Sequence, residues 1–298
     1  IQGDVMFNGD LDKWVRFANS LRLRYLLRIS KRLSDFSEMQ ALADSGRLMQ
    51  SNDDNALVPY LGAAPNQYPL TNESLGLYLE HRMTRTVDSV VSLWNDPRVE
   101  VLYKPTNASI NAGMPAYKGL LNGQDRETIA ERDIDLNDIS PFGSIFRDVP
   151  NGVDAQFMQY SEVQFALAEA VERGFISGDA QTFYENGITA SFEYYGVALP
   201  NDYMERDAIA LDGSDNLTKI LTQKWLSLIS VGHEAWFNVR RTGLPNLQPG
   251  PDNLNNGRYP ARYFYPESEQ ATNSTNYAEA AERIGGDDIN SEGWWERN

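Results

Sequence analysis

The segment of residues 160–197 constrains the fold of this chain more than any other part of the sequence. It reads as two consecutive helices, residues 161–170 and residues 180–188, joined by a turn that contains glycine. Apolar and small residues recur through both helices at intervals of three and four, which places them on one face of each helix. Such a pair buries its apolar face by stacking, within the pair or against further pairs.

Small residues in this pair occur at positions typical of a tetratricopeptide repeat. When Ala168 is set on the small residue of the first repeat helix, Ala180 falls on the small residue of the second helix and Tyr184 on its aromatic position. Gly187 then lies near the next small position. An ordinary antiparallel helix pair is the alternative that one repeat alone leaves open. Repeat scaffolds usually hold partners rather than break bonds.

The charge of the chain bears on its partners. The chain has 298 residues, 41% of them hydrophobic, and a formal net charge of -16 from 42 acidic and 26 basic residues. This charge disfavours binding to nucleic-acid phosphates or to an anionic lipid surface, so neutral ligands such as sugars, or cationic ligands, are favoured.

The absence of cysteine excludes disulfides, thiolate metal sites and thiol nucleophiles. The first residues show no signal sequence, and no apolar run is long enough to span a bilayer.

Proline placement divides the chain. Prolines are absent before Pro59 and again between Pro150 and Pro200, and a proline inside a helix removes a hydrogen bond. Helical segments are therefore expected on either side of a central loop-rich layer. We expect one domain over residues 1–298, with helical residues 1–51, a loop-rich layer of 52–157, a helical repeat and closing hairpin of 158–245, and an irregular tail of 246–298.

Apolar residues at helical spacing predict further helices. The expected ranges are residues 11–29, 36–49, 77–94, 217–229, 234–241 and 277–283. Gly243 and Pro245 supply the stop signals for the helix that precedes them. The first of these helices is rich in arginine and lysine. In so acidic a chain, we expect these cations to pair with neighbouring helices rather than with nucleic acid.

Motifs for catalysis or metal binding are incomplete in this sequence. Residues 233–234 begin like a zinc-protease motif, but Phe237 stands where the second histidine is required. Residues 133–137 resemble the first half of a calcium-binding loop, yet Asp138 occupies the position that needs glycine. The sequence also lacks phosphate-binding glycine motifs and a serine nucleophile motif. We therefore predict a protein that is not an enzyme and that has no cofactor or metal.

The central layer carries many aromatic and amide residues. Aromatic faces stack on the C–H faces of sugar rings, while amides hydrogen-bond the hydroxyls. The alternative for each ring is that it anchors its loop to the core. The residues that we predict to bind ligand are Trp94, Tyr103, Tyr117, Tyr68 and Asn107.

Four blocks of the chain, in order, resemble the SusD/RagB family of outer-membrane lipoproteins of Bacteroidetes. The first is the run NGDLDKWVRFANSLRLR, followed by RIS, in residues 8–30. The others are residues 160–170, residues 223–245, and the tail residues 260–295 with PARYFYP, GGDDI and a Trp-Trp pair. The resemblance covers only the later part of the family pattern, because the lipidated cysteine and the first helical region of the family are not in this sequence.

The resemblance implies a mostly α fold, a tetratricopeptide-like right-handed helical superhelix with an irregular loop-rich layer packed on one side. It also implies a non-catalytic protein on the extracellular face of the outer membrane, lipid-anchored at full length. Such a protein captures oligosaccharides for uptake through a SusC-like TonB-dependent transporter. Peptide capture for the same class of transporter is the alternative, and a glycoside hydrolase is a more distant one.

Several residues of the resembling blocks are expected to be structural. Trp225, Trp236, Arg240 and Arg241 are predicted to hold the helices and the tail together, and they are not predicted ligand contacts. The ligand site is instead expected in the variable central layer.

Overall fold

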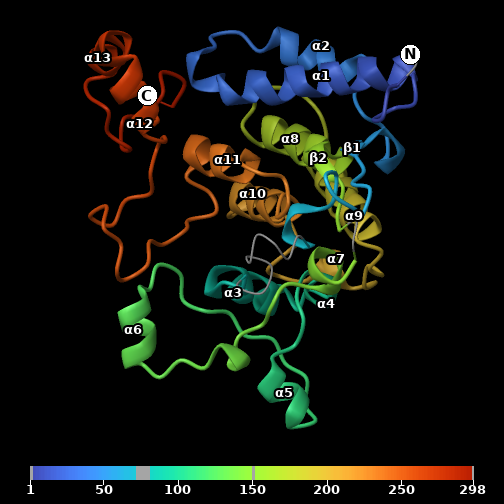
Figure 1. Ribbon diagram of the computed structural model, residues 1–298. Helices are drawn as coiled ribbons and strands as arrows, with labels where there is room; N and C mark the ends of the chain where they lie inside the picture. The colour runs from blue at the N-terminus through green and yellow to red at the C-terminus, as the bar shows by residue number, and fades with distance from the viewer. Residues whose placement is uncertain (1–2, 72–80, 150–151, 297–298) are drawn as a thin grey trace.

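The computed structural model describes residues 3–71, 81–149 and 152–296. Its scaffold consists of consecutive helix pairs: α1 (Leu11–Arg28) with α2 (Ser37–Asp44), α8 (Tyr160–Glu172) with α9 (Ala180–Tyr194), and α10 (Asn216–Ser227) with α11 (Glu234–Thr242). Helix α8 lies in the middle of the stack and contacts α1, α9 and α10 (Figure 1). Among the described residues, no helix combines the length and the apolar composition that crossing a membrane requires.

The α8–α9 pair packs closely because a glycine of α9 lies against an aromatic ring of α8. A Cβ atom added at Gly187 would lie 2.7 Å from the ring of Phe165, so only glycine fits this position. Ala168 is fully buried, and the Tyr184 ring fills the groove with its hydroxyl donating to the carbonyl of Ile209 at 3.0 Å. The predicted helix pair is therefore confirmed, with Ala168, Tyr184 and Gly187 in its packed interior, while Ala180 at the start of α9 is half-buried.

Two other predicted helices are shorter than expected. Helix α2 ends at Asp44, and helix α3 spans Arg85–Trp94 rather than residues 77–94. Residues 77–80 lie outside the described residues. Residues 82–84 are extended because they pair with other loops, and the Met83 amide donates to the carbonyl of Ser140 at 2.8 Å.

The loop-rich layer leaves the helical stack and rejoins it at one place. Strands β1 (Ala56–Val58) and β2 (Ala155–Met158) pair in antiparallel fashion at its two ends. Between them the layer contains short helices: α3, α4 (Val99–Leu102), α5 (Asn107–Asn111), α6 (Arg126–Glu131) and α7 (Ser144–Arg147). In Figure 1, α5 and α6 lie at the end of the molecule opposite to α1 and α2.

A buried arginine ties this layer to the stack. Arg98 is fully buried and donates to Asp96 at 2.6 Å, to the Ser191 hydroxyl of α9 at 2.8 Å and to the Gln223 side chain of α10 at 2.8 Å. Burial alone raises the pKa of Asp96, but Arg98 and the Tyr203 hydroxyl more than offset this effect and lower it. A charged, fully hydrogen-bonded cluster thus holds α3 and α4 in a fixed position on the helices.

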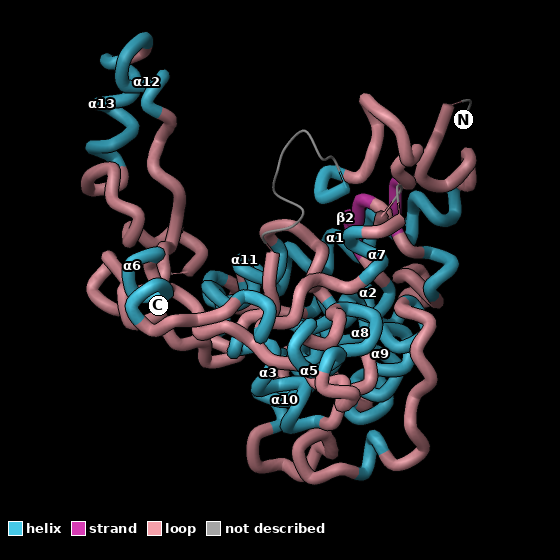
Figure 2. The backbone as a smooth tube through the Cα atoms, turned by 60° about the horizontal axis from the view of Figure 1, so that its bottom comes forward, coloured by secondary structure: helices cyan, strands magenta, loops and turns pink. Residues whose placement is uncertain are grey.

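The C-terminal tail is extended and carries α12 (Glu267–Thr272) and α13 (Ser274–Arg283) on an arm that stands apart from the stacked helices (Figure 2). Its last described residues return to the scaffold. Arg240 of α11 forms two hydrogen bonds of 2.6 Å with Glu296, and Arg32 donates to the carbonyl of Trp294 at 2.7 Å. The predicted role of Arg240 in joining helices and tail is confirmed.

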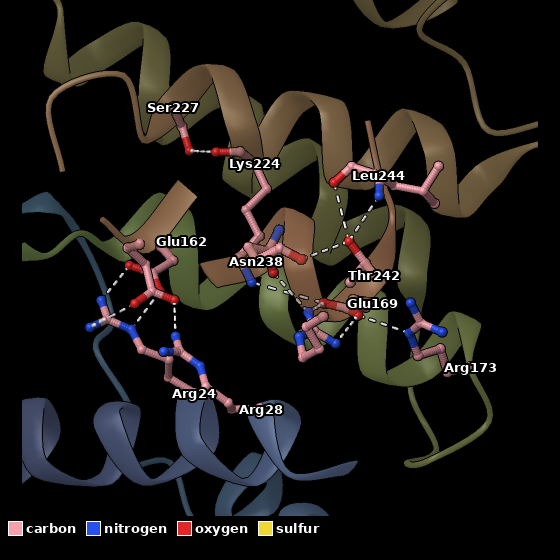
Figure 3. A network of polar contacts seen from close by, with 12 residues as sticks. Arg24, Arg28, Glu162, Glu169, Arg173, Lys224, Ser227, Asn238, Thr242 and Leu244 are labelled. Atoms are coloured by element: carbon pink, nitrogen blue, oxygen red, sulfur yellow. Dashed lines mark hydrogen bonds and ion pairs between the residues drawn. The ribbon is translucent and has the colours of Figure 1, made fainter. Parts of the chain in front are cut away.

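Two glutamates of α8 are fully buried, and each is paired with arginine (Figure 3). Glu162 accepts hydrogen bonds from Arg24 of α1 at 2.5 and 2.7 Å. Glu169 accepts two bonds of 2.6 Å from Arg241 of α11. Burial alone raises the pKa of Glu169, but Arg241, Lys224 and Arg173 outweigh it and lower the pKa to about 2. The cations of α1 therefore pair with neighbouring helices, as predicted.

Replacing Glu169 with glutamine should lower the free energy of unfolding by about 3–5 kcal/mol, because Arg241 keeps its buried charge without a counter-ion. Urea unfolding followed by circular dichroism measures this. Glu131→Gln, at an exposed position of α6, is the matched control and should change stability by less than about 0.5 kcal/mol. Equal stability of the two variants would contradict the assigned role.

The pH dependence of the free energy of unfolding should also show the contribution of the Glu169 ion pair. The pKa of Glu169 is lowered on folding from 4.5 to about 2. Its stabilising contribution is therefore complete above the unfolded pKa and is lost as the pH falls through this window. We expect the Glu169→Gln variant to lose less stability between neutral and acidic pH than the parent chain, as measured by urea midpoints across pH.

Candidate functional site

Two of the predicted ligand-binding aromatics belong to the core. Trp94 is 4% exposed and Tyr103 is 3% exposed. Trp94 follows Val87 and Val91 on one stripe of α3, which faces the helices. Tyr103 pairs with Phe142, 5.5 Å away between ring centroids. Both rings belong to the core cluster that includes residues of α9 and α10, which favours the alternative that each ring anchors its loop to the core. A ligand contact for either ring stays a prediction.

The other two predicted tyrosines are only partly buried. Tyr68 contacts the edge of Tyr60, with 5.4 Å between ring centroids, and burial together with Tyr60 raises its pKa to about 12. Tyr117 packs on the outside of the same core, and its pKa is raised by burial and then by the charge of Glu100. Both rings anchor loops with one side and expose part of the other. A ligand contact for either residue stays a prediction.

Asn107 lies in a surface hollow of about 440 Å³. Its amide donates to the Asn137 side chain at 3.2 Å, which brings α5 beside the turn of residues 135–137. We call this site the amide hollow; its lining residues are Asn107, Ala108, Ile110, Asn111, Asp135 and Asn137. Trp94 lines a different hollow, between α3 and α10, so the structure does not bring these two predicted residues together.

A second hollow, of about 700 Å³, lies on the other side of the turn of residues 135–137. Leu136 lines this second hollow, whereas its neighbours Asp135 and Asn137 line the amide hollow. We call it the arginine hollow; its lining residues are Arg82, Met83, Thr84, Leu120, Leu121, Asn122, Gly123, Gln124, Arg126, Ile129 and Leu136. The two hollows together form a polar face with aliphatic patches on the loop-rich layer.

The polar side chains of this face are of kinds that can hydrogen-bond hydroxyl groups. Amide side chains both donate and accept, carboxylates accept, and guanidinium groups donate, so together they match the alternating hydroxyls of a sugar. The calcium-like stretch of residues 133–137 has a structural use, because an Asp135 carboxylate oxygen accepts from the backbone and side-chain amides of Asn137 at 2.8 and 2.9 Å. Within the described ranges, no group of three or more His, Asp or Glu side chains is arranged to hold a metal ion.

Sequence reasoning missed most of this face. The sequence did not predict three residues of this face: Arg126, Asn122 and Gln124. Each has the character of an ordinary surface residue, and only the fold places it in the same hollow as Arg82. The signal that was available is the density of amides and charged residues between 107 and 137, in a stretch with few large apolar residues.

The scaffold and the loop layer define a tetratricopeptide-like helical protein. The chain matches, over residues 1–266, the model of the SusD-like family that is described as starch-binding and associating with the outer membrane. The chain therefore belongs to the SusD-like family, and the family and fold class expected from the sequence are confirmed. A search of curated protein sequences gave no match.

Solved structures agree with this assignment. A SusD homologue from Bacteroides fragilis has a TM-score of 0.85 and 30% identity, covering 100% of this chain and 70% of its own. A Bacteroides vulgatus protein, described as an outer membrane protein connected with nutrient binding, has a TM-score of 0.87 and 27% identity, with coverage of 100% and 70%. A chitin-binding protein has a TM-score of 0.83 and 30% identity, with coverage of 100% and 68%.

The burial of Trp94 predicts a stability defect on its replacement. Trp94→Ala should lower the free energy of unfolding by about 3–5 kcal/mol, since a large buried side chain is removed, and Trp94→Phe should cost less. Denaturant unfolding measures the difference. Leu93→Ala is the matched control, because the neighbouring Leu93 is 71% exposed and its truncation should have little effect. A stable Trp94→Ala variant would mean that this ring is not part of the core.

Proposed function

We propose that this chain captures neutral oligosaccharides at the cell surface, outside the outer membrane, and passes them uncleaved to a SusC-like TonB-dependent transporter. The observation that carries the proposal is the similarity of the whole chain, at 30% identity, to a chitin-binding protein. The family description, which names starch binding and the outer membrane, supports the same function.

The loop-layer face suits such a ligand. Side chains from α5, α6 and the turn of residues 135–137 offer donors and acceptors around two adjoining hollows, and Ile110, Ile129 and Leu136 supply apolar patches between them. Because the face is open and shallow, it can hold a segment of a longer chain whose ends extend into solvent. A transported polymer fragment has this shape. Asn107 is the predicted residue that lines this face, whereas a ligand contact of Tyr117 or Tyr68, which line neither hollow, stays a prediction.

The net charge of the chain provides a way to distinguish a neutral sugar ligand from a charged peptide ligand. A neutral sugar has no net Coulomb interaction with a chain of charge -16, so its affinity should not depend on ionic strength. A cationic peptide would bind this chain more weakly as salt is added. Salt dependence of the affinity is therefore the measurement that distinguishes the two classes of cargo.

Isothermal titration of the chain with chitohexaose and maltohexaose tests the proposal. We expect binding of at least one of them, unchanged by added sodium chloride. Asn107→Ala, which changes a residue of the amide hollow, should weaken it by about threefold to tenfold through the loss of a hydrogen bond. Asn276→Ala, at an exposed position of α13, is the control and should bind as the parent does.

Two results would contradict the proposal. One is the absence of binding to both hexasaccharides together with salt-sensitive binding of a cationic peptide. The other is the appearance of shorter sugars when either hexasaccharide is incubated with the chain and the mixture is separated by chromatography.

The transporter step is checked by co-purification of the chain with a TonB-dependent barrel from detergent-solubilised outer membranes.

A further inference from the structure

Among the described residues, no aromatic side chain lines the two loop-layer hollows, whereas a third cavity, of about 470 Å³, has aromatic walls. It lies between α10, α11 and the tail, and we call it the tail pocket. Its lining residues are Trp225, Ala235, Trp236, Val239, Arg240, Gly243, Pro245, Asn246, Leu247, Tyr259, Pro260, Ala261, Glu292 and Glu296. Its volume is within the range of pockets that bind small ligands.

Three aromatic side chains of separate segments meet at this pocket. Trp225 comes from α10, Trp236 from α11 and Tyr259 from the tail. The two tryptophans are partly exposed and Tyr259 is 43% exposed, while local burial still raises the Tyr259 pKa. The Arg240 guanidinium lies over the Trp236 ring, 4.5 Å from its centroid, and Phe237 stacks against the same ring. Trp225 and Tyr259 are therefore the rings of this pocket on which the C–H face of a sugar ring can pack.

The polar part of the pocket is also suited to a sugar. Glu296 is 6% exposed and is held by two bonds of 2.6 Å from Arg240, so this ion pair contributes a neutral, rigid wall. Asn246 and Glu292 add an amide and a carboxylate from two further segments. Planar polar side chains beside aromatic rings hydrogen-bond the equatorial hydroxyls of a ring that is stacked on them.

The tail wall of the pocket is built by specific bonds. The backbone amide of Ala261 donates to the carbonyl of Ile289 at 2.7 Å, and the Trp236 indole donates to the carbonyl of Pro260 at 3.1 Å. The Asn255 and Asn290 side chains hydrogen-bond each other at 2.8 Å behind it. These bonds hold the segment that carries Tyr259 at a fixed distance from α11, so the pocket is present before a ligand arrives.

We propose that the tail pocket is a second binding site for a neutral saccharide, separate from the loop-layer face. This inference rests on the proposed function. The loop-layer face recognises hydroxyls, and the tail pocket supplies the stacking surface for sugar rings. Trp225 and Trp236, which the sequence assigned to the scaffold alone, thus have two roles: each packs its helix with one part of the ring and lines the pocket with another.

Tryptophan fluorescence reports this site selectively, because Trp225 and Trp236 line the tail pocket and no tryptophan lines either loop-layer hollow. Chitohexaose and maltohexaose are titrated into the 298-residue chain while indole emission is recorded. Calorimetry measures total binding in parallel. We expect a saturable change of emission, weakened about tenfold in affinity by Tyr259→Ala through loss of one stacking partner.

Ala261→Phe fills the pocket and should abolish the change of emission, while calorimetry still detects binding at the loop-layer face. Tyr25→Ala is the matched control, since Tyr25 is 55% exposed on α1, away from both sites. Thermal unfolding midpoints establish that each variant is folded. If Ala261→Phe fails to fold, the exposed position of Tyr259 still allows Tyr259→Ala to decide the question.

The outcomes separate the two proposals. Saccharide binding by calorimetry with no change of emission, or with a change that Tyr259→Ala and Ala261→Phe leave intact, overturns the tail pocket and leaves the proposed function standing. The absence of binding by either method overturns both. A change of emission that is lost only in the two tail-pocket variants, and kept in Tyr25→Ala and Asn107→Ala, supports the second site.

Discussion

The packing of this protein depends on the buried carboxylates of helix α8. Glu162 and Glu169 lie on α8 two turns apart, both without solvent contact, and each accepts hydrogen bonds from an arginine of another helix. Arg24 of α1 satisfies the first and Arg241 of α11 the second. A different order of helices would leave a charge buried without a partner, which costs more than a buried ion pair contributes to stability. These ion pairs therefore act mainly by selecting one arrangement of the stack.

The fixed stack determines what the loop-rich layer can do. The cluster around Arg98 joins the layer to α9 and α10, and the paired strands hold its two ends together, so its short helices project from a rigid base. Turns such as residues 135–137 can then present polar side chains at set positions without a regular structure of their own. A ligand that meets such a surface does not have to order it first, which preserves affinity for a weakly held sugar.

Sequence reasoning was reliable where periodicity carries the information. The helices of α1, α8, α9, α10 and α11 follow from apolar spacing, and Gly187 from the need for close approach. It did not predict the burial of Trp94 and Tyr103, because aromatic character alone does not distinguish a buried ring from an exposed one. For Trp94, the helical stripe that it shares with Val87 and Val91 indicates the burial. The loop-layer hollows join α5, α6 and residues 135–137, and no local pattern records contacts between segments so far apart.

The separation of polar and aromatic surfaces follows from how each is stabilised. Amides and carboxylates tolerate open loops because water satisfies them when no ligand is present, so they can lie on the irregular layer. A large ring without a support of its own packs onto the nearest apolar surface, as Trp94 at the end of α3 and Tyr103 after α4 do in the core. An open aromatic platform therefore needs a rigid support on its other side. Helices α10 and α11, closed by the Arg240–Glu296 ion pair, supply that support to Trp225 and Trp236, two rings of the proposed tail site.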